Sequence, residues 1–432
     1  MSTAFTEEQA RAYMHKLLAT MSQAGGSDLF IASDFPASMK SQGQMKPLTN
    51  QKLNPELTRM LAHSMMNESQ RAEFAKEMEC NVAISIPGVS RFRVNVLMQQ
   101  RCVSMVIRTI ASEIPNFEKL KLPETLKEVV MTKRGLVLVV GATGSGKSTT
   151  LAAMIDHRNR TSPGHIITVE DPVEYVHASQ MSLVTHREVG IDTHSWHHAL
   201  KNTLRQAPDV ILIGEIRDAE TMEHAIAFAE TGHLCLGTLH ANSASQTIER
   251  IINFFSEDRK KQLLMDLSAT PRSIVSQRLV RREDGKGRSA AIEILLNTPT
   301  IAEKIFNGEF HEIKTIMSRS RELGMCTFDA ALFDLYDAGL ISFDEAIRNA
   351  DSANELRLNI KLKSKRGEPA VSEFGGLSLN PMTQPAELEE RAHQKMLQQQ
   401  ESRRKFEEEQ LRQLREKKRQ AELAAAGATK QA

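Results

Sequence analysis

Polar and apolar residues alternate between residues 81 and 110, and this period of two predicts three β-strands. A turn is expected at Pro87-Gly88, between the first two strands. Upstream, residues 5–23 carry apolar positions at helical spacing, and a second helical pattern begins at Asn54 and continues to about residue 79. We therefore expect an N-terminal domain of the α+β class.

The hydrophobic pattern changes after residue 135. Leu136–Val140 is a continuous apolar run bounded by glycine, which is typical of a strand buried on both faces of a parallel sheet. Similar runs recur at residues 165–169, 210–213 and 234–238. Helical patterns separate these runs, so the alternation predicts a doubly wound α/β domain. After residue 257 the pattern is mostly helical to about residue 350, with one short strand expected at residues 290–296.

These changes of pattern divide the chain into five parts. We expect an N-terminal α+β domain, a linker, a P-loop α/β domain, a flexible linker and a charged helix, at residues 1–111, 112–124, 125–356, 357–385 and 386–425 respectively. The apolar positions of the last segment do not keep a heptad repeat. An exposed single helix is therefore favoured over a coiled coil.

Composition restricts the function classes. The 55 basic and 54 acidic side chains give a formal net charge of +1, so no global attraction to nucleic acid or anionic lipid is expected. The four cysteines form no CxxC pair, which argues against a structural zinc site or a disulfide framework. The start of the chain lacks signal-peptide features, and no apolar run approaches the roughly 20 residues of a spanning helix. We expect a cytoplasmic protein without an integral membrane segment.

A phosphate-binding motif gives the strongest chemical signal. Gly141–Ser148 fits G-x-x-x-x-G-K-[ST] and lies between a predicted strand and a predicted helix, as this motif requires. Backbone N–H groups of such a loop converge on phosphates, while Lys147 reaches the β- and γ-phosphates and the Ser148 hydroxyl ligates Mg²⁺. ATP with Mg²⁺ is the expected ligand. Its expected contacts are Gly141, Ala142, Thr143, Gly144, Ser145, Gly146, Lys147, Ser148 and Thr149.

Three later segments offer the acidic and basic groups that phosphate hydrolysis needs. Glu170 follows the run at residues 165–169, Glu215 follows the next run, and His240 follows the last one. The carboxyl ends of parallel strands share one edge of a sheet, so these side chains are expected near the phosphate loop. Glu215 then stands in the position of a magnesium-binding acid, together with Ser148.

The segments GATGSGKSTTLAAM, ITVEDPVEYVH, DVILIGEIRDAET and ETGHLCLGTLHANSA occur in this order. In them the chain resembles the type II/IV secretion ATPase superfamily, in particular the PilT-type retraction ATPases of type IV pili, and is closest to the PilU-type accessory retraction ATPases. The resemblance covers about residues 10–355. It implies a PAS-like N-terminal domain and a RecA-like ATPase domain in a homohexameric motor, located at the inner-membrane base of a pilus and active in twitching motility.

The resemblance also implies roles for individual residues. Glu170 would activate the attacking water, Glu215 would be the Walker-B acid, and His240 would sense the γ-phosphate with support from His233. Both glutamates lie at strand ends, so the pattern alone leaves open which one activates water. In this family, arginines of the N-terminal hairpins approach the nucleotide from the same or a neighbouring subunit. The corresponding candidates are Arg93 and Arg108, among Arg91, Arg93, Arg101 and Arg108.

The partners implied are a principal retraction ATPase of the same family and an inner-membrane platform protein. Residues 300–305 depart from the basic retraction-associated segment of the relatives, which leaves a weakly or non-catalytic accessory subunit as an alternative. A type II secretion or pilus assembly ATPase is a second alternative, and a nucleic-acid translocase is disfavoured because basic and aromatic residues do not interleave. His194, His197 and His198 show no acidic partner at metal-ligand spacing, so no metal site is expected there.

Overall fold

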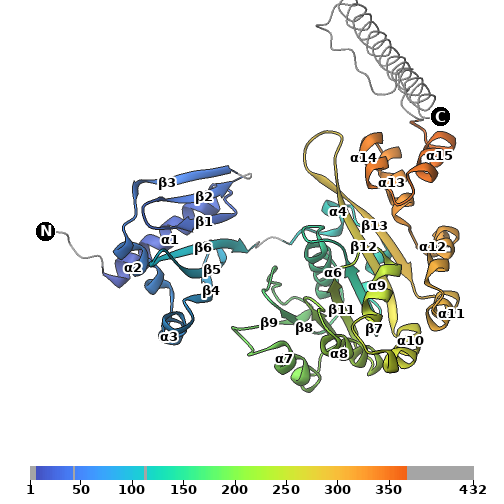
Figure 1. Ribbon diagram of the computed structural model, residues 1–432, viewed down its shortest axis with the longest axis horizontal. Coiled ribbons are helices and arrows are strands. Elements are labelled where there is room, and N and C mark those ends of the chain that lie inside the picture. The colour runs from blue at the N-terminus through green and yellow to red at the C-terminus, as the bar shows by residue number, and fades with distance from the viewer. Residues whose placement is uncertain (1–5, 42–43, 111–113, 367–432) are drawn as a thin grey trace, which may run out of the picture. The chain divides into compact units, whose positions relative to one another are not determined.

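The computed structural model describes residues 6–41, 44–110 and 114–366. The N-terminal elements are α1 (Glu7–Gln23), β1 (Asp28–Ile31), β2 (Pro36–Ser41), β3 (Gln44–Lys52), α2 (Pro55–Met65), α3 (Glu68–Glu77), β4 (Glu79–Ile86), β5 (Ser90–Gln99) and β6 (Cys102–Ile110). The strands form one antiparallel sheet in the order β3-β2-β1-β6-β5-β4 (Figure 1). The predicted α+β class and the three strands β4 to β6 are confirmed.

Two expectations for the N-terminal domain were incomplete. The single helix expected from Asn54 to about residue 79 is two helices, because Asn67 caps a new helix with its side chain and forms a capping box with Gln70. Strands β2 and β3 were not predicted. Most of β3 is exposed at the edge of the sheet, so its sequence carries no apolar alternation.

One face of the N-terminal sheet packs on helices and the other is polar. Phe92, Val94 and Val96 of β5 are fully buried in a core shared with α1 and α2. The residues between them project to the opposite face, as the two-residue period of a strand requires. Arg91 and Arg93 therefore share the polar face, as expected.

The second part of the chain is built on a seven-stranded sheet in the order β13-β12-β7-β11-β10-β8-β9. Its elements are α4 (Phe117–Leu120), α5 (Thr125–Val130), β7 (Gly135–Val140), α6 (Lys147–Thr161), β8 (Gly164–Glu170), β9 (Ser182–Glu188), α7 (Trp196–Thr203), β10 (Val210–Ile213), α8 (Ala219–Glu230), β11 (Leu234–Leu239), α9 (Ala244–Ile252), α10 (Lys260–Ala269), β12 (Pro271–Arg281) and β13 (Arg288–Leu296). All neighbouring strands are parallel except the β12–β13 pair. The doubly wound α/β prediction is confirmed.

Strand β7 shows why this sheet is buried on both faces. Leu136, Leu138 and Val140 belong to one core cluster, whereas Val137 and Val139 belong to another, and all five are fully buried. The first cluster contains side chains of α8, α9 and α10, and the second contains those of α5 and α6. A strand covered by helices on both sides has no polar face, which explains its uninterrupted apolar run.

Among the described residues, five further α-helices follow the sheet (Figure 1): α11 (Pro299–Asn307), α12 (Phe310–Arg319), α13 (Phe328–Asp337), α14 (Phe343–Asn349) and α15 (Ala353–Lys363). The expectation of a mostly helical region from residue 257 missed β12, which is 11 residues long. It also missed β9. The segment expected as a linker at residues 112–124 contains α4, and its Phe117 and Leu122 are buried in the second core cluster.

Helix α15 extends past the domain end expected at residue 356 and into the range of the predicted flexible linker. The charged helix expected at residues 386–425 lies outside the described residues. Within the part of the chain that the structure describes, no helix combines the length and the apolar character needed to cross a membrane.

Candidate phosphate and catalytic site

The loop between β7 and α6 folds around three glycines with positive φ. Gly141, Gly144 and Gly146 have φ values of 152°, 77° and 90°, a region that side chains disfavour. A Cβ atom on Gly141 would lie 2.5 Å from both the Gln277 carbonyl oxygen and Ser145 Oγ. The loop can therefore follow this path only with glycine at that position.

Helix α6 begins without a side-chain cap, and Gly146 occupies its N-cap position. The first-turn N–H groups of a helix have no intrahelical acceptors, and the helix dipole adds partial positive charge there. Ser145 Oγ is buried and has no hydrogen-bond partner, whereas Thr143, Gly144 and Ser148 are exposed. These uncapped donors and the glycine cradle fit a polyphosphate, as the motif predicts.

Lys147 and Thr149 form hydrogen bonds with nearby groups of the site. Lys147 Nζ donates to the carbonyl oxygens of Gly141 and Ala142 at 2.9 and 3.1 Å, so its ammonium group lies beside the loop. Burial lowers the Lys147 pKa, opposed by the nearby Glu215 carboxylate. The Thr149 hydroxyl is 3.0 Å from the Tyr175 hydroxyl.

The three predicted catalytic side chains lie at the carboxyl ends of neighbouring parallel strands. Glu170 is the last residue of β8, Glu215 lies just after β10, and His240 follows β11, while the phosphate loop follows β7. Because β7, β11, β10 and β8 are adjacent in the sheet, their ends meet at one edge (Figure 1). Ser148 and Glu170 also line one small cavity of about 20 Å³.

Glu215 lies next to two basic side chains, Arg217 and His240, at this edge of the sheet. Its carboxylate is 2.6 Å from Arg217 and 3.0 Å from His240 Nε2. The hydrogen bond from Arg217 is the main reason that the pKa of Glu215 is lowered, and His240 and Lys147 add to the effect. Glu215 is therefore ionised at neutral pH. A carboxylate and the exposed Ser148 hydroxyl are oxygen ligands of the kind that Mg²⁺ prefers.

Glu170 has a contrasting environment. It is 9% exposed, and burial raises its pKa from 4.5 to about 7. Hydrogen bonds from Thr168 and from the Glu174 backbone partly offset this effect, and the nearby charges of Glu174 and Glu188 add to it. A base whose pKa lies near the working pH can accept a proton and release it again, which is the property required for general base catalysis. The two glutamates are thus differentiated by their surroundings.

The predicted arginines lie on the polar face of the N-terminal sheet. Arg93 of β5 is paired in register with Arg108 of β6, so the two side chains are neighbours on one face. Arg108 Nε is 2.8 Å from Asp28, yet 70% of the Arg108 side chain is exposed. Arg101 instead lies in the turn between these strands with a φ of 64°.

Two residues at the phosphate loop were not found from the sequence. Gln277 of β12 is 3% exposed and accepts a 2.7 Å hydrogen bond from the Thr150 hydroxyl of α6. Arg217 pairs with Glu215, as described above. His233 was expected to support the site, but it directly precedes β11, at the end opposite to His240, and contacts Thr231 and the Phe228 carbonyl. The structure therefore does not bring His233 together with Glu170, Glu215 and His240.

The histidines near Trp196, where no metal site was expected, lie in two separate groups. Ring nitrogens of His197 and His224 and a carboxylate oxygen of Glu220 lie within 4.8 Å of one another on α7 and α8. His194 and His198 instead pack edge to face, with ring centroids 6.0 Å apart. The acidic neighbour that sequence spacing did not show comes from α8. The three nearby histidines of the sequence are thus divided between two groups.

The family model described as "Type II/IV secretion system protein" matches residues 6–327. This chain belongs to the type II/IV secretion system protein family. "Type IV pilus ATPase PilU" of Pseudomonas aeruginosa is 58% identical over 365 residues, which cover 84% of this chain and 96% of that protein. "Type IV pilus retractation ATPase PilT" of the same species is 41% identical, with coverages of 78% and 97%.

A solved structure of a family member has the same fold. The crystal structure of the pilus retraction motor PilT with bound ADP matches with a TM-score of 0.74 and 39% identity, covering 80% of this chain and 98% of that one. The resemblance inferred from the four sequence motifs is therefore confirmed. The family assignment rests on nearly the whole described chain rather than on the phosphate loop alone.

Proposed function

We propose that this protein is a motor ATPase that hydrolyses ATP at the phosphate loop and uses the energy to retract type IV pili in twitching motility. The observation that carries the proposal is the meeting of four parallel strand ends at the loop, with Glu170, Glu215 and His240 at one edge. Similarity to proteins named as type IV pilus ATPases and to a retraction motor with bound ADP supports it.

In the proposed reaction, the oxygen of a water molecule attacks the γ-phosphorus of ATP, the bond from that phosphorus to the ADP oxygen breaks, and Glu170 takes the water proton. The buried carboxyl with its raised pKa supports the choice of Glu170 over the ionised and ion-paired Glu215. Loop N–H groups and Lys147 would bind the β- and γ-phosphates.

The Ser148 hydroxyl and the Glu215 carboxylate would hold Mg²⁺, which when bound neutralises charge on the phosphate oxygens. His240 Nε2 is 3.0 Å from Glu215, so a γ-phosphate contact at His240 would also report on the metal-binding acid. Arg93 and Arg108 would supply cations to the nucleotide from the same or a neighbouring subunit, which is why we propose activity in a homohexamer.

The protein would act at the cytoplasmic face of the inner membrane, with a principal retraction ATPase of its family and a platform protein as partners. The identity of 58% to PilU against 41% to PilT supports cooperation with a separate principal motor. A weakly catalytic or non-catalytic accessory subunit is the second candidate, favoured by the altered residues 300–305. Steady-state ATP turnover by the purified protein separates the two.

Lys147→Ala tests the assigned site. Loss of its ammonium group should reduce ATP turnover by at least about 100-fold, the usual effect of removing an electrostatic stabiliser of the transition state. Lys201→Ala, at an exposed position of α7, is the control. Both variants should unfold at the same denaturant concentration as the wild type. Turnover at the wild-type rate in Lys147→Ala would overturn the site assignment.

A further inference from the structure

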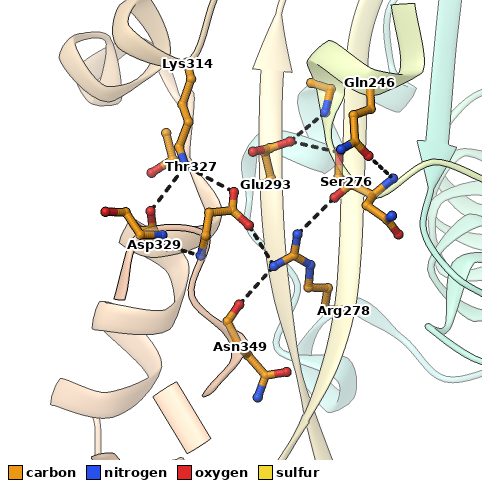
Figure 2. A network of polar contacts seen from close by, with 12 residues as sticks. Gln246, Ser276, Arg278, Glu293, Lys314, Thr327, Asp329 and Asn349 are labelled. Atoms are coloured by element: carbon orange, nitrogen blue, oxygen red, sulfur yellow. Dashed lines mark hydrogen bonds and ion pairs between the residues drawn. The ribbon is translucent and has the colours of Figure 1, made fainter. Parts of the chain in front are cut away.

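A network of polar side chains links the loop after His240 to the last helices of the described residues (Figure 2). Its centre is Arg278 of β12, between the β-sheet and the helices that follow it. Its Nη2 atom donates a hydrogen bond to the Asn242 carbonyl oxygen at 3.2 Å. Its Nη1 atom donates to the Asn349 carbonyl oxygen at 2.9 Å and forms an ion pair with Asp351 at 2.8 Å. Arg278 thus links the Asn242 loop to Asn349, at the end of α14, and to Asp351, just before α15.

Arg278 also contacts the first residue of helix α13. Its guanidinium carbon lies 4.0 Å from the ring centroid of Phe328, the first residue of α13. A planar group with several donors in fixed directions can hold two sets of acceptors together, which the single ammonium of lysine cannot reproduce. The Arg278 guanidinium therefore contacts both the Asn242 loop and α13.

A second contact holds the same loop. Glu293 of β13 is 2% exposed and accepts hydrogen bonds from the Ala244 backbone N–H at 2.7 Å and from the Ser276 hydroxyl at 3.0 Å (Figure 2). Ala244 is the first residue of α9, and it follows His240 by one short loop. The stretch from the proposed γ-phosphate sensor to α9 is thus held by two residues of the β12–β13 hairpin.

On its far side the network joins three helices. Lys314 of α12 lies 3.3 Å from Asp329 of α13 and 3.2 Å from Asp351. Asp329 in turn accepts hydrogen bonds from the backbone N–H groups of Asp351 and Ser352. Ser352 is the N-cap position of α15, so these contacts define where α15 begins.

The neighbouring residue on β12 faces the phosphate loop. Gln277 bonds to Thr150 of α6, and its backbone oxygen lies where a side chain on Gly141 would be placed. Successive residues of a strand point to opposite sides. Gln277 therefore contacts α6 beside the phosphate loop, while Arg278 contacts the Asn242 loop and Asn349. The phosphate loop, the loop after His240 and the α13–α15 region therefore all contact the same short piece of β12.

We infer that Arg278 is a positioning residue that couples nucleotide binding at the phosphate loop to the conformation of α13–α15. The inference rests on the proposed function, because it requires a nucleotide at that loop. A nucleotide that moves His240 displaces Asn242, and Arg278 transmits this movement to Asn349 and Asp351. Helix α15 is the last described element before residues 367–432, so this coupling gives the nucleotide site control over the part of the chain that leads to them.

Hydrogen exchange on the full-length protein tests the coupling, with Mg²⁺ and the non-hydrolysable analogue AMP-PNP as the probe. In the wild type, the analogue should change the exchange of backbone amides in residues 343–363. In Arg278→Gln this nucleotide-dependent change should fall by about fivefold or more, the lower end of usual allosteric couplings. Asp351→Asn should have the same effect, and Arg278→Lys should restore only part of the response.

The control is Arg281→Gln, at an exposed position of the same strand. Calorimetric binding of AMP-PNP in each preparation separates the two proposals. Absence of binding in the wild type contradicts the proposed function. Binding without a change in residues 343–363 of the wild type overturns the coupling. A purely structural role of Arg278 would raise exchange equally with and without nucleotide, which also overturns it. Should Arg278→Gln not fold, Asp351→Asn decides.

Discussion

Replacement of Glu170 by glutamine tests whether burial gives this residue the raised pKa on which its proposed role as the base depends. The variant keeps the size of the side chain and removes its ionisable group. In the wild type, burial raises the Glu170 pKa from 4.5 to about 7. A group with a raised pKa in the folded state contributes its full stability below pH 4.5, and this contribution is lost as the pH rises through about 7. The glutamine variant has no such dependence.

The magnitude follows from the two pKa values. At about 1.4 kcal/mol for each pH unit, the rise from 4.5 to about 7 corresponds to about 3 kcal/mol of unfolding free energy. Roughly 1.4 kcal/mol of this is lost between pH 6 and pH 8, because the folded wild type holds a proton there that the unfolded chain has released. The wild type should therefore lose about 1.4 kcal/mol more than Glu170→Gln over this range.

Urea unfolding at pH 6 and pH 8 measures this double difference, which is the loss of unfolding free energy of the wild type minus that of the variant. Trp196 is the only tryptophan of the chain and packs against the core of the seven-stranded sheet, so its fluorescence follows the part that contains Glu170. Glu230→Gln is the matched control, because Glu230 is an exposed carboxylate at the end of α8. A double difference near zero for Glu170→Gln would refute the argument from burial.

ATP turnover provides the catalytic half of this test. Turnover of the wild type should rise with pH through about 7, since only the ionised Glu170 can accept the water proton. Glu170→Gln should lower turnover by about 100-fold or more at pH 8. Undiminished turnover would reassign the base. Loss of turnover without the double difference would mean that Glu170 is required but has an ordinary pKa.

Three further predictions follow from the site and the N-terminal sheet. Gly141→Ala should lower the free energy of unfolding by about 2 kcal/mol or more and abolish nucleotide binding, because its Cβ would overlap the Gln277 carbonyl; urea unfolding should show a smaller loss for Gly144→Ala, which has no atom within 4 Å of its added Cβ. Arg108→Ala should lower the unfolding free energy by about 1 to 3 kcal/mol, because it leaves the buried Asp28 carboxylate without its ion-pair partner, and should also lower ATP turnover by about 10-fold or more; equal turnover in the two proteins would exclude Arg108 from catalysis. Removal of Mg²⁺ with a chelator should stop turnover, and Glu215→Gln should raise the Mg²⁺ concentration needed to restore it; an unchanged Mg²⁺ requirement would contradict Glu215 as a ligand.

Local sequence patterns predicted the elements whose residues face a uniform environment. The strands β7, β8, β10 and β11 are covered on both faces, so their apolar runs were recognisable without any knowledge of neighbours. Strand β12 was missed because its buried positions include Ser273, Ser276 and Gln277, whose hydroxyl and amide groups interrupt the apolar pattern. Ser276 and Gln277 bond to Glu293 and Thr150, which are distant in the sequence.

The sequence by itself determined the phosphate loop, the positions along the chain of four buried strands, and the family, because each depends on residue types at short, regular spacing. Only the tertiary structure decided which glutamate is buried and which is ion-paired, since the pKa values of Glu170 and Glu215 depend on groups from other strands. The contacts of Arg278 likewise arise from loops and helices far apart in the chain. Burial and long-range pairing are properties of the packed molecule, and no local pattern encodes them.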